Sequence, residues 1–197
     1  MDEQADILAV SQLIYSERHW RDAGQWEKMR SAYHPESIVR VAWFQGNGFE
    51  FVEASKDMHR QGQSKHRLSP TIVRLNGDRS IAETDTVIET RTLYGDIEVD
   101  TTANCRLFSR IRRDGGLWRL ASLDVIYEKD MLAPVNPSDH LTINREELQS
   151  YRPSYRFLCY TLHSIGRSVD PHLPGDDRPD LVEALYAEAE DWLVKKR

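Results

Sequence analysis

Three glycine-containing turns divide the middle of the chain into long stretches of strand-forming residues. The turns lie at residues 76–78, 94–96 and 114–116, and their Asn, Asp and Gly residues are typical of hairpin connections. Strands are therefore expected at residues 71–75, 80–93, 97–112 and 117–127. Because strands joined by such short turns run antiparallel, this part of the chain is predicted to form a meander sheet.

The residues before the meander have a helical periodicity. In residues 3–21 apolar side chains recur mostly every three or four positions, which predicts a long amphipathic helix with Gly24 at its C-terminal cap. A shorter helix is expected at 26–33, a strand at 37–44 and a third helix at 49–60. The predicted class is α+β, with a curved antiparallel or mixed sheet wrapped around three N-terminal helices.

The pattern changes again after residue 130. A stretch with Pro and Asn at 133–137 looks like a linker, and helical patterns follow at 146–165 and 180–194. We therefore divide the chain into a domain at 1–130 and a helical C-terminal extension at 131–197. Because its apolar residues would expose a large patch in water, the extension is expected to pack on the core or on a neighbouring subunit and to help close a pocket.

Composition excludes several kinds of partner. There are 26 Lys and Arg against 32 Asp and Glu, and the net charge of -6 offers no basic excess to nucleic acid or to an anionic membrane surface. No run approaches the roughly 20 apolar residues of a membrane span. Only two cysteines occur, and the acidic N-terminus does not resemble a signal peptide, so a cytoplasmic protein is expected.

Motifs of several common enzyme classes are absent from the sequence. There is no Gly-rich phosphate loop, no G-x-S-x-G and no H-E-x-x-H, and no set of His and Cys residues has the spacing of a zinc site. We therefore expect chemistry that needs no metal and no other cofactor.

One pair of residues could form a general base. His66 comes just before the first meander strand, and Asp22 ends the first predicted helix. A carboxylate that binds one ring nitrogen of a histidine fixes its tautomer and stabilises the charge that the ring gains with a proton. The alternative is that Asp22 merely ends a helix and His66 lies on a solvated loop.

Other side chains are candidates for substrate binding. Asn104 and Arg106 share the polar phase of the predicted strand at 97–112, so they either stabilise negative charge in a pocket or lie in solvent, and Arg91 presents the same alternatives. Tyr33 and Trp43 are either ordinary core side chains or walls of a pocket for a flat substrate. Tyr15 either packs against its neighbours as an ordinary helix residue or brings its hydroxyl to the mouth of the pocket.

Several short motifs in the first 130 residues are similar to those of a known family. Among them are Arg21-Asp22-Ala23-Gly24-Gln25-Trp26, Tyr33-His34-Pro35-Glu36, Ser64-Lys65-His66 and Gly116-Leu117-Trp118-Arg119-Leu120. They resemble the SnoaL-like branch of the nuclear transport factor two-like superfamily. The resemblance implies a cone-shaped sheet that encloses a pocket.

Members of this branch include polyketide cyclases, ketosteroid isomerases, scytalone dehydratase, a hexachlorocyclohexane dehydrochlorinase and formaldehyde-releasing lyases that act on lignin-derived dimers. In the dehydratase and the dehydrochlorinase an Asp and a His form a base dyad, and Asp22 and His66 occupy the corresponding places. The resemblance thus implies a catalytic role for this pair.

The resulting hypothesis is a cofactor-independent lyase that eliminates water, halide or formaldehyde from a small hydrophobic, aromatic or polycyclic substrate, with His66 as the base. The rivals are a ketosteroid-type isomerase or polyketide cyclase and, in a different class, a non-catalytic ligand-binding or oligomerisation module. An isomerase would rather use a carboxylate base, and a binding module needs no Asp to orient a His. We expect a homo-oligomer, a dimer or trimer, without nucleic acid or membrane partners.

Overall fold

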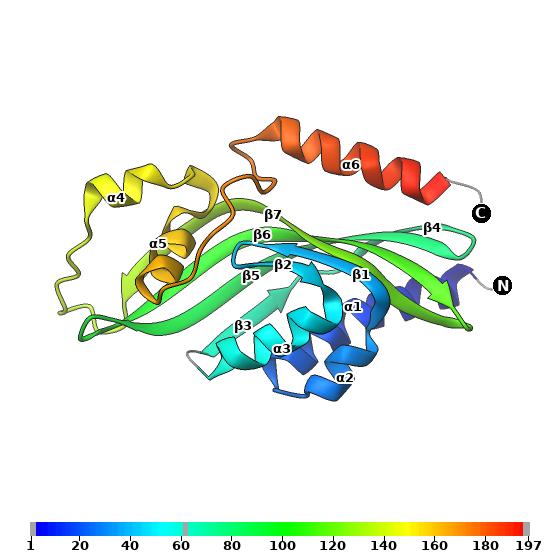
Figure 1. Cartoon of the computed structure of the whole chain (residues 1–197), viewed down its shortest axis with the longest axis horizontal. Helices are drawn as coiled ribbons and strands as arrows, with labels where there is room; N and C mark the ends of the chain where they lie inside the picture. The colour runs from blue at the N-terminus through cyan, green and yellow to red at the C-terminus, as the bar shows by residue number, and fades with distance from the viewer. Residues whose placement is uncertain (1–2, 61–62, 195–197) are drawn as a thin grey trace.

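A single curved sheet with helices on both faces forms the framework of the computed structural model, which describes residues 3–60 and 63–194 (Figure 1). The strands are β1 (Tyr33–Val41), β2 (Phe44–Asn47), β3 (Gln63–Leu68), β4 (Ile72–Asn76), β5 (Arg79–Tyr94), β6 (Ile97–Asp114) and β7 (Leu117–Pro134). Their order is β2-β1-β7-β6-β5-β3, and β4 also pairs with β5. The β1–β7 pair is parallel and the other pairs are antiparallel.

The helices are distributed over two faces and one end of the sheet. They are α1 (Glu3–Asp22), α2 (Trp26–Ser31), α3 (Gly48–His59), α4 (Arg145–Ser150), α5 (Arg156–Ser164) and α6 (Pro179–Val194). Figure 1 shows α1, α2 and α3 below the sheet, α6 across the opposite face, and α4 and α5 at one end. The predicted α+β class is confirmed. No helix within the described ranges is long and apolar enough to cross a membrane.

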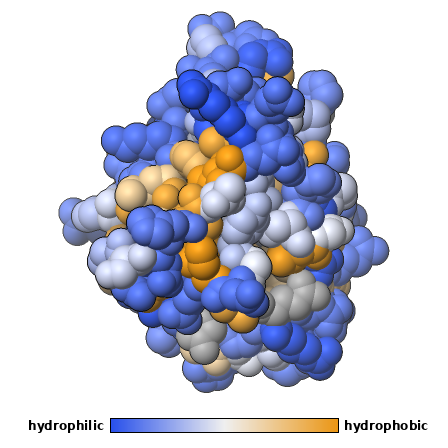
Figure 2. Space-filling view, turned by 90° about the vertical axis from the view of Figure 1, so that its left-hand side faces the viewer, coloured by the Kyte–Doolittle hydropathy of each residue, from blue (hydrophilic) through white to orange (hydrophobic). Residues whose placement is uncertain are grey.

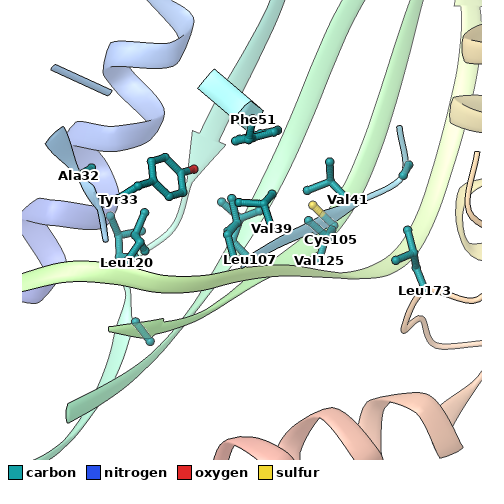
Figure 3. Packing of buried hydrophobic residues seen from close by; sticks show 14 of the residues in the cluster. Ala32, Tyr33, Val39, Val41, Phe51, Cys105, Leu107, Leu120, Val125 and Leu173 are labelled. Atoms are coloured by element: carbon teal, nitrogen blue, oxygen red, sulfur yellow. The ribbon is translucent and has the colours of Figure 1, made fainter. Parts of the chain in front are cut away.

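The main hydrophobic core lies between the N-terminal helices and the concave face of the sheet. Tyr33, Val39, Phe51, Leu107 and Val125 pack there, as Figure 3 shows. A smaller cluster lies under α6 and contains Ile81, Phe108, Ile126, Leu185 and Leu193. Leu107 and Phe108 belong to different clusters because successive residues of a strand point to opposite faces.

Two predicted element boundaries near the N-terminus are wrong. The second helix ends at Ser31, and the chain enters β1 at Tyr33, which pairs with Leu120 of β7. The residues around Pro35 therefore extend a strand and do not end a helix. The single strand expected at 37–44 is instead the end of β1 and the start of β2, which pair through Val41 and Phe44.

The C-terminal boundaries also differ from the prediction. β7 continues to Pro134, which pairs with Val99, so the expected linker begins inside a strand. The helix expected at 146–165 is broken into α4, a short 3-10 turn at Pro153–Tyr155 and α5. Pro153 explains the break, because proline disfavours the helical conformation of the residue before it, and Arg152 is extended.

Candidate active site

The buried face of α1 changes from apolar to charged along the helix. Val10 and Ile14 are buried first, and Glu17, Arg18 and Arg21 follow them on the same face. Residues three or four positions apart lie on one side of a helix, so this spacing carries the charged side chains toward the interior. α1 thereby places two guanidinium groups and one carboxylate inside the protein.

Asp22, the last residue of α1, contacts both the ring and the backbone of His66. Its Oδ1 lies 2.8 Å from the His66 Nδ1, and its Oδ2 accepts a hydrogen bond of 2.6 Å from the His66 backbone N–H. The ammonium group of Lys65 donates to the Asp22 main-chain oxygen at 2.7 Å. The expected contact between Asp22 and His66 is therefore confirmed.

His66 belongs to a strand that the sequence did not indicate. It lies in β3, where it pairs with Ile88 of β5, and its side chain is only 4% exposed. The alternative that His66 lies on a solvated loop is therefore wrong. Most residues of β3 are polar, so no alternation of apolar and polar residues marked this segment as a strand.

The charges around this pair set its protonation state. Burial lowers the pKa of His66, the charges of Arg21 and Arg18 lower it further, and the Asp22 hydrogen bond only partly opposes them, so that the pKa is about 4. Burial would raise the pKa of Asp22, but the hydrogen bonds from the His66 ring and backbone lower it to about 2. At neutral pH the pair consists of a neutral imidazole and a carboxylate.

This protonation state leaves one ring nitrogen available as a base. The hydrogen of the neutral imidazole is on Nδ1, because the carboxylate beside it can only accept. Among residues 3–60 and 63–194, no side chain or backbone group hydrogen-bonds Nε2 of His66. The Nε2 lone pair can therefore take a proton from a bound molecule.

The His66 side chain lines a cavity of about 90 Å³ between the sheet, α1, α3 and α5. Its polar end is formed by Arg18, Arg21, Ser64 and His66. Its other walls are mostly apolar and include Trp43, Phe51, Met58, Ile88, Leu107 and Val125. The arrangement places a neutral base and two cations together beside mostly apolar walls.

Three residues of α5 line one side of this cavity, together with Ile165 just after the helix: Leu158, Thr161 and Leu162. Figure 2 shows hydrophobic side chains exposed at the end of the molecule that carries α4 and α5. Ile165, which lines the cavity, is 38% exposed. The C-terminal residues thus contribute a wall of the cavity.

The buried arginines were not singled out from the sequence as site residues. Arg18 donates two hydrogen bonds to Glu17, and the Tyr33 hydroxyl donates a third to Glu17 at 2.8 Å. Nη1 of Arg21 donates to the Ser64 hydroxyl at 2.8 Å and to Asp22 Oδ1 at 3.3 Å. The sequence feature that could have revealed them is that these charged residues lie on the face of the first helix that otherwise carries apolar residues.

The three aromatic candidates have different environments. Trp43 lines the cavity. Tyr33 is buried beside Glu17 and is not one of the lining residues. The Tyr15 hydroxyl accepts a hydrogen bond of 2.9 Å from the Thr71 backbone N–H and lines a separate polar groove, which also contacts Asp22 and His66.

The expectation that Asn104, Arg106 and Arg91 face a pocket is not met in this cavity. The phase of β6 that contains Leu107 faces the cavity, so Asn104 and Arg106 point to the other face. Arg106 donates to Glu83 and Glu128 at 3.0 Å beneath α6. Arg91 is exposed and is paired with Asp100 at 2.7 Å.

The donor groups around the cavity give no indication of a metal centre. No group of three or more His, Cys, Asp or Glu side chains suited to holding a metal occurs in the part of the chain that the structure describes.

Residues 2–124 match the SnoaL-like domain, and the chain belongs to this family. The expected resemblance to the SnoaL branch of the nuclear transport factor two-like superfamily is confirmed, and the curved, unclosed sheet fits its cone fold. The Pea pathogenicity protein 2 of Fusarium vanettenii is 30% identical and aligns with 97% of this chain and 87% of its own. An uncharacterized protein of Emericella nidulans is 31% identical over 90% of this chain and 81% of its own.

Solved structures share the fold at low sequence identity. A putative scytalone dehydratase from Novosphingobium aromaticivorans superimposes with a TM-score of 0.58 and 11% identity, covering 71% of this chain and 97% of its own. A hexachlorocyclohexane dehydrochlorinase, LinA type 2, has a TM-score of 0.58 and 12% identity, covering 72% of this chain and 96% of its own.

Proposed function

We propose that this protein is a cofactor-independent lyase in which His66, oriented by Asp22, removes a proton from a small, mainly hydrophobic substrate. The observation that carries the proposal is a neutral imidazole that is fixed through Nδ1, has no described hydrogen-bond partner at Nε2 and lines a mostly apolar cavity. A base of this kind contributes typically about 10²–10⁴ to the rate. The names of the dehydratase and dehydrochlorinase among the structural neighbours agree with an elimination.

The proposed reaction balances without an external reagent. His66 Nε2 takes a proton from a carbon, the C–H electron pair forms a double bond to the adjacent carbon, and the leaving group departs with the electrons of its own bond. Water or a halide ion would be released in this way. For formaldehyde release, His66 would instead take the hydroxyl proton of a hydroxymethyl group, and the O–H electron pair would form the C=O bond of formaldehyde. The electrons of the broken C–C bond would then form the double bond as a leaving group departs from the adjacent carbon. The proton then passes from His66 to the leaving group or to water, and the base is regenerated.

Tyr127 is the proposed donor to the leaving group. It lines the cavity, and its hydroxyl oxygen accepts a hydrogen bond of 2.9 Å from the Ala42 backbone N–H. A hydroxyl that accepts from the backbone still has its own hydrogen to donate. Burial raises the pKa of Tyr127 well above its ordinary value, so the phenol remains protonated at neutral pH.

The cavity size supports a compact substrate. Its volume of about 90 Å³ is well below the roughly 300–1,000 Å³ of typical ligand pockets. One ring or a short branched chain is therefore favoured over a polycyclic molecule, which would need α5 to move.

A cytoplasmic location, a homo-oligomeric state and the division into 1–130 and 131–197 remain predictions from the sequence.

The isomerase or cyclase alternative has less support. A carboxylate base would have to reach the substrate, and no Asp or Glu is among the described residues that line the cavity. The carboxylate of Asp22 is occupied by His66 and has a pKa of about 2, which makes it a weak base. A purely binding role does not require Asp22 to orient the His66 ring.

The test is a screen of one-ring substrates that carry a halide, hydroxyl or hydroxymethyl group beside an acidic C–H bond. Conjugated products are detected by ultraviolet absorbance and mass. His66→Ala should lower kcat about 10²–10⁴-fold and leave KM largely unchanged, and Asp22→Asn should lower it by a similar or smaller factor. His163→Ala, which alters an exposed histidine, is the matched control.

Two results would contradict the proposal. One is a His66→Ala protein that melts normally and keeps most of its kcat. The other is a product with the same mass as the substrate, which would identify an isomerase.

A further inference from the structure

The polar end of the cavity contains two buried arginines with unused hydrogen-bond donors. Arg18 is 4% exposed and Arg21 is 8% exposed, and both line the cavity. In the described part of the chain, Nη1 of Arg18 and Nη2 of Arg21 have no hydrogen-bond partner, and Nε of Arg21 is fully buried without one. Buried guanidinium groups are normally paired, since a desolvated charge is costly.

The nearby carboxylates neutralise these two cations unequally. Glu17 accepts two hydrogen bonds from Arg18 and one from Tyr33, so its charge is committed to Arg18. Asp22 shares Oδ1 between His66 and a long 3.3 Å contact with Arg21, and its Oδ2 accepts from the His66 backbone. Arg21 thus has only a part of one carboxylate as its counter-charge.

The pKa of Arg21 agrees with this lack of counter-charge. Burial lowers the pKa of Arg21, and the positive charge of Arg18 lowers it further, against the smaller opposing effect of Asp22. Arg18 has a raised pKa because Glu17 outweighs the effect of burial. An additional anion beside Arg21 would relieve this imbalance.

We infer that the cavity binds a substrate that carries a carboxylate, which Nη2 of Arg21 and Nη1 of Arg18 hold beside His66. This inference deepens the proposed function, because it names the class of molecule on which the same base would act. Guanidinium groups bind carboxylates through strong, charge-assisted hydrogen bonds, and the low dielectric around buried arginines strengthens them. The apolar walls would hold the hydrocarbon part of the acid.

A permanently ionised group fits this site better than a transient oxyanion. An oxyanion forms only in the transition state. Before that point, in the enzyme with its substrate bound, Arg21 would still have only the partial counter-charge of Asp22. A carboxylate neutralises it from the moment of binding. The neutral His66 adds no cation to the site, so the two arginines are the groups that would attract the acid.

The experiment compares acids with amides of the same shape by isothermal titration at pH 7.5. Benzoate is paired with benzamide, and isobutyrate with isobutyramide. In the unmodified protein the acid of at least one pair should bind tenfold or more tightly than its amide. Arg21→Gln should bring that ratio close to one, while Arg74→Gln, which removes an exposed arginine paired with Glu190, should leave it unchanged.

Failure of this inference can be separated from failure of the proposed function. Two results with the unmodified protein overturn the carboxylate site, even if Arg21→Gln does not fold. One is equal binding of acid and amide. The other is that no acid binds up to about 20 mM in a direct titration, which is an order-of-magnitude upper limit for a specific site. Persistence of the ratio in a folded Arg21→Gln protein also overturns it. If His66→Ala still prefers the acid over its amide, the anion site is upheld. If His66→Ala also keeps its full turnover, the proposed lyase mechanism is contradicted while the anion site stands.

Discussion

Asp22 holds His66 at two points, with Oδ1 2.8 Å from the ring Nδ1 and Oδ2 2.6 Å from the backbone nitrogen. One carboxylate therefore joins the end of α1 to β3 and fixes the orientation of the imidazole at the same time. Rotation of the ring would break the contact with Oδ1. The direction of Nε2 is consequently set by the packing of two elements, through two residues that are 44 positions apart in sequence.

The first prediction concerns the pH dependence of activity. Because His66 acts as a base only when neutral and its pKa is about 4, the acid limb of kcat/KM should lie near pH 4 and not near the ordinary value of about 6.5. A pH–rate profile from 3.5 to 8 measures this. His163→Gln should leave the limb unchanged, and a limb at pH 6 to 7 would contradict a base with the lowered pKa of His66.

The same shift has a consequence for stability. Between pH 4 and about 6.5 the unfolded chain binds a proton at this histidine that the folded protein does not, so the free energy of unfolding should rise with pH across this interval. His66→Asn keeps a donor for Asp22 without a titrating ring. Melting temperatures of the variant should therefore vary less between pH 4.5 and 6.5 than those of the unmodified protein.

Much of the framework was predictable because its signals are local. The turns at 76–78, 94–96 and 114–116 separate β4 from β5, β5 from β6 and β6 from β7, as their sequences indicate. β3 was not predicted, because its polar residues form a strand only through pairing with β5. The extent of β7 was also missed, since its last residues depend on pairing with the start of β6.

The candidate site was predictable only in part. The Asp22–His66 contact was expected through the family resemblance, and the structure contains it. The face of β6 toward the cavity was left open, because alternation alone does not say which phase is covered by α6. The roles of Arg18 and Arg21 depend on which carboxylates lie beside them, and this information is not present in the spacing of the sequence.

The second prediction concerns Asp130, which binds the N-terminus of α5 through a 2.7 Å hydrogen bond from the Leu158 backbone N–H to Oδ2. Burial raises the pKa of Asp130 to about 6, although the backbone donors oppose this effect. A raised carboxylate pKa means that stability is lost as pH rises from about 4 through 6. Asp130→Asn keeps an acceptor and removes the charge, so it should raise stability at pH 7.5 by about 1 to 2 kcal/mol.

Denaturant unfolding at pH 4 and pH 7.5 measures this effect. The gain should be largest at pH 7.5 and small at pH 4. Asp130→Ala is the control for the helix cap and should lower stability by about 1 kcal/mol relative to Asp130→Asn at both values. An Asp130→Asn protein that is destabilised equally at both pH values would contradict the prediction.

The third prediction concerns Gly48, the first residue of α3. A methyl group at this position would overlap Oγ of Ser37 and the ring of Tyr33. Tyr33 is buried, and its hydroxyl donates to Glu17, which in turn binds Arg18. A shift of the Tyr33 ring that relieves the overlap would therefore also disturb the carboxylate that holds Arg18. Gly48→Ala should therefore lower stability by about 1 to 3 kcal/mol. Glu53→Ala, on the exposed side of α3, should change denaturant unfolding little, and equal stability of the two variants would contradict the packing.

The last prediction concerns the removal of residues 135–197, which retains β7 and deletes α4, α5 and α6. The deletion removes the α5 wall of the cavity formed by Leu158 and Leu162. It also uncovers Ile81, Phe108 and Ile126, which α6 now covers with Leu185 and Leu193. Since large exposed apolar surfaces promote association, the truncated protein should aggregate and bind a hydrophobic dye. Light scattering and dye fluorescence measure this. Deletion of 179–197 alone, which removes α6, should expose the cluster beneath α6 but keep the cavity. A monodisperse truncated protein with unchanged melting and ligand binding would show that the C-terminal helices do not stabilise the sheet.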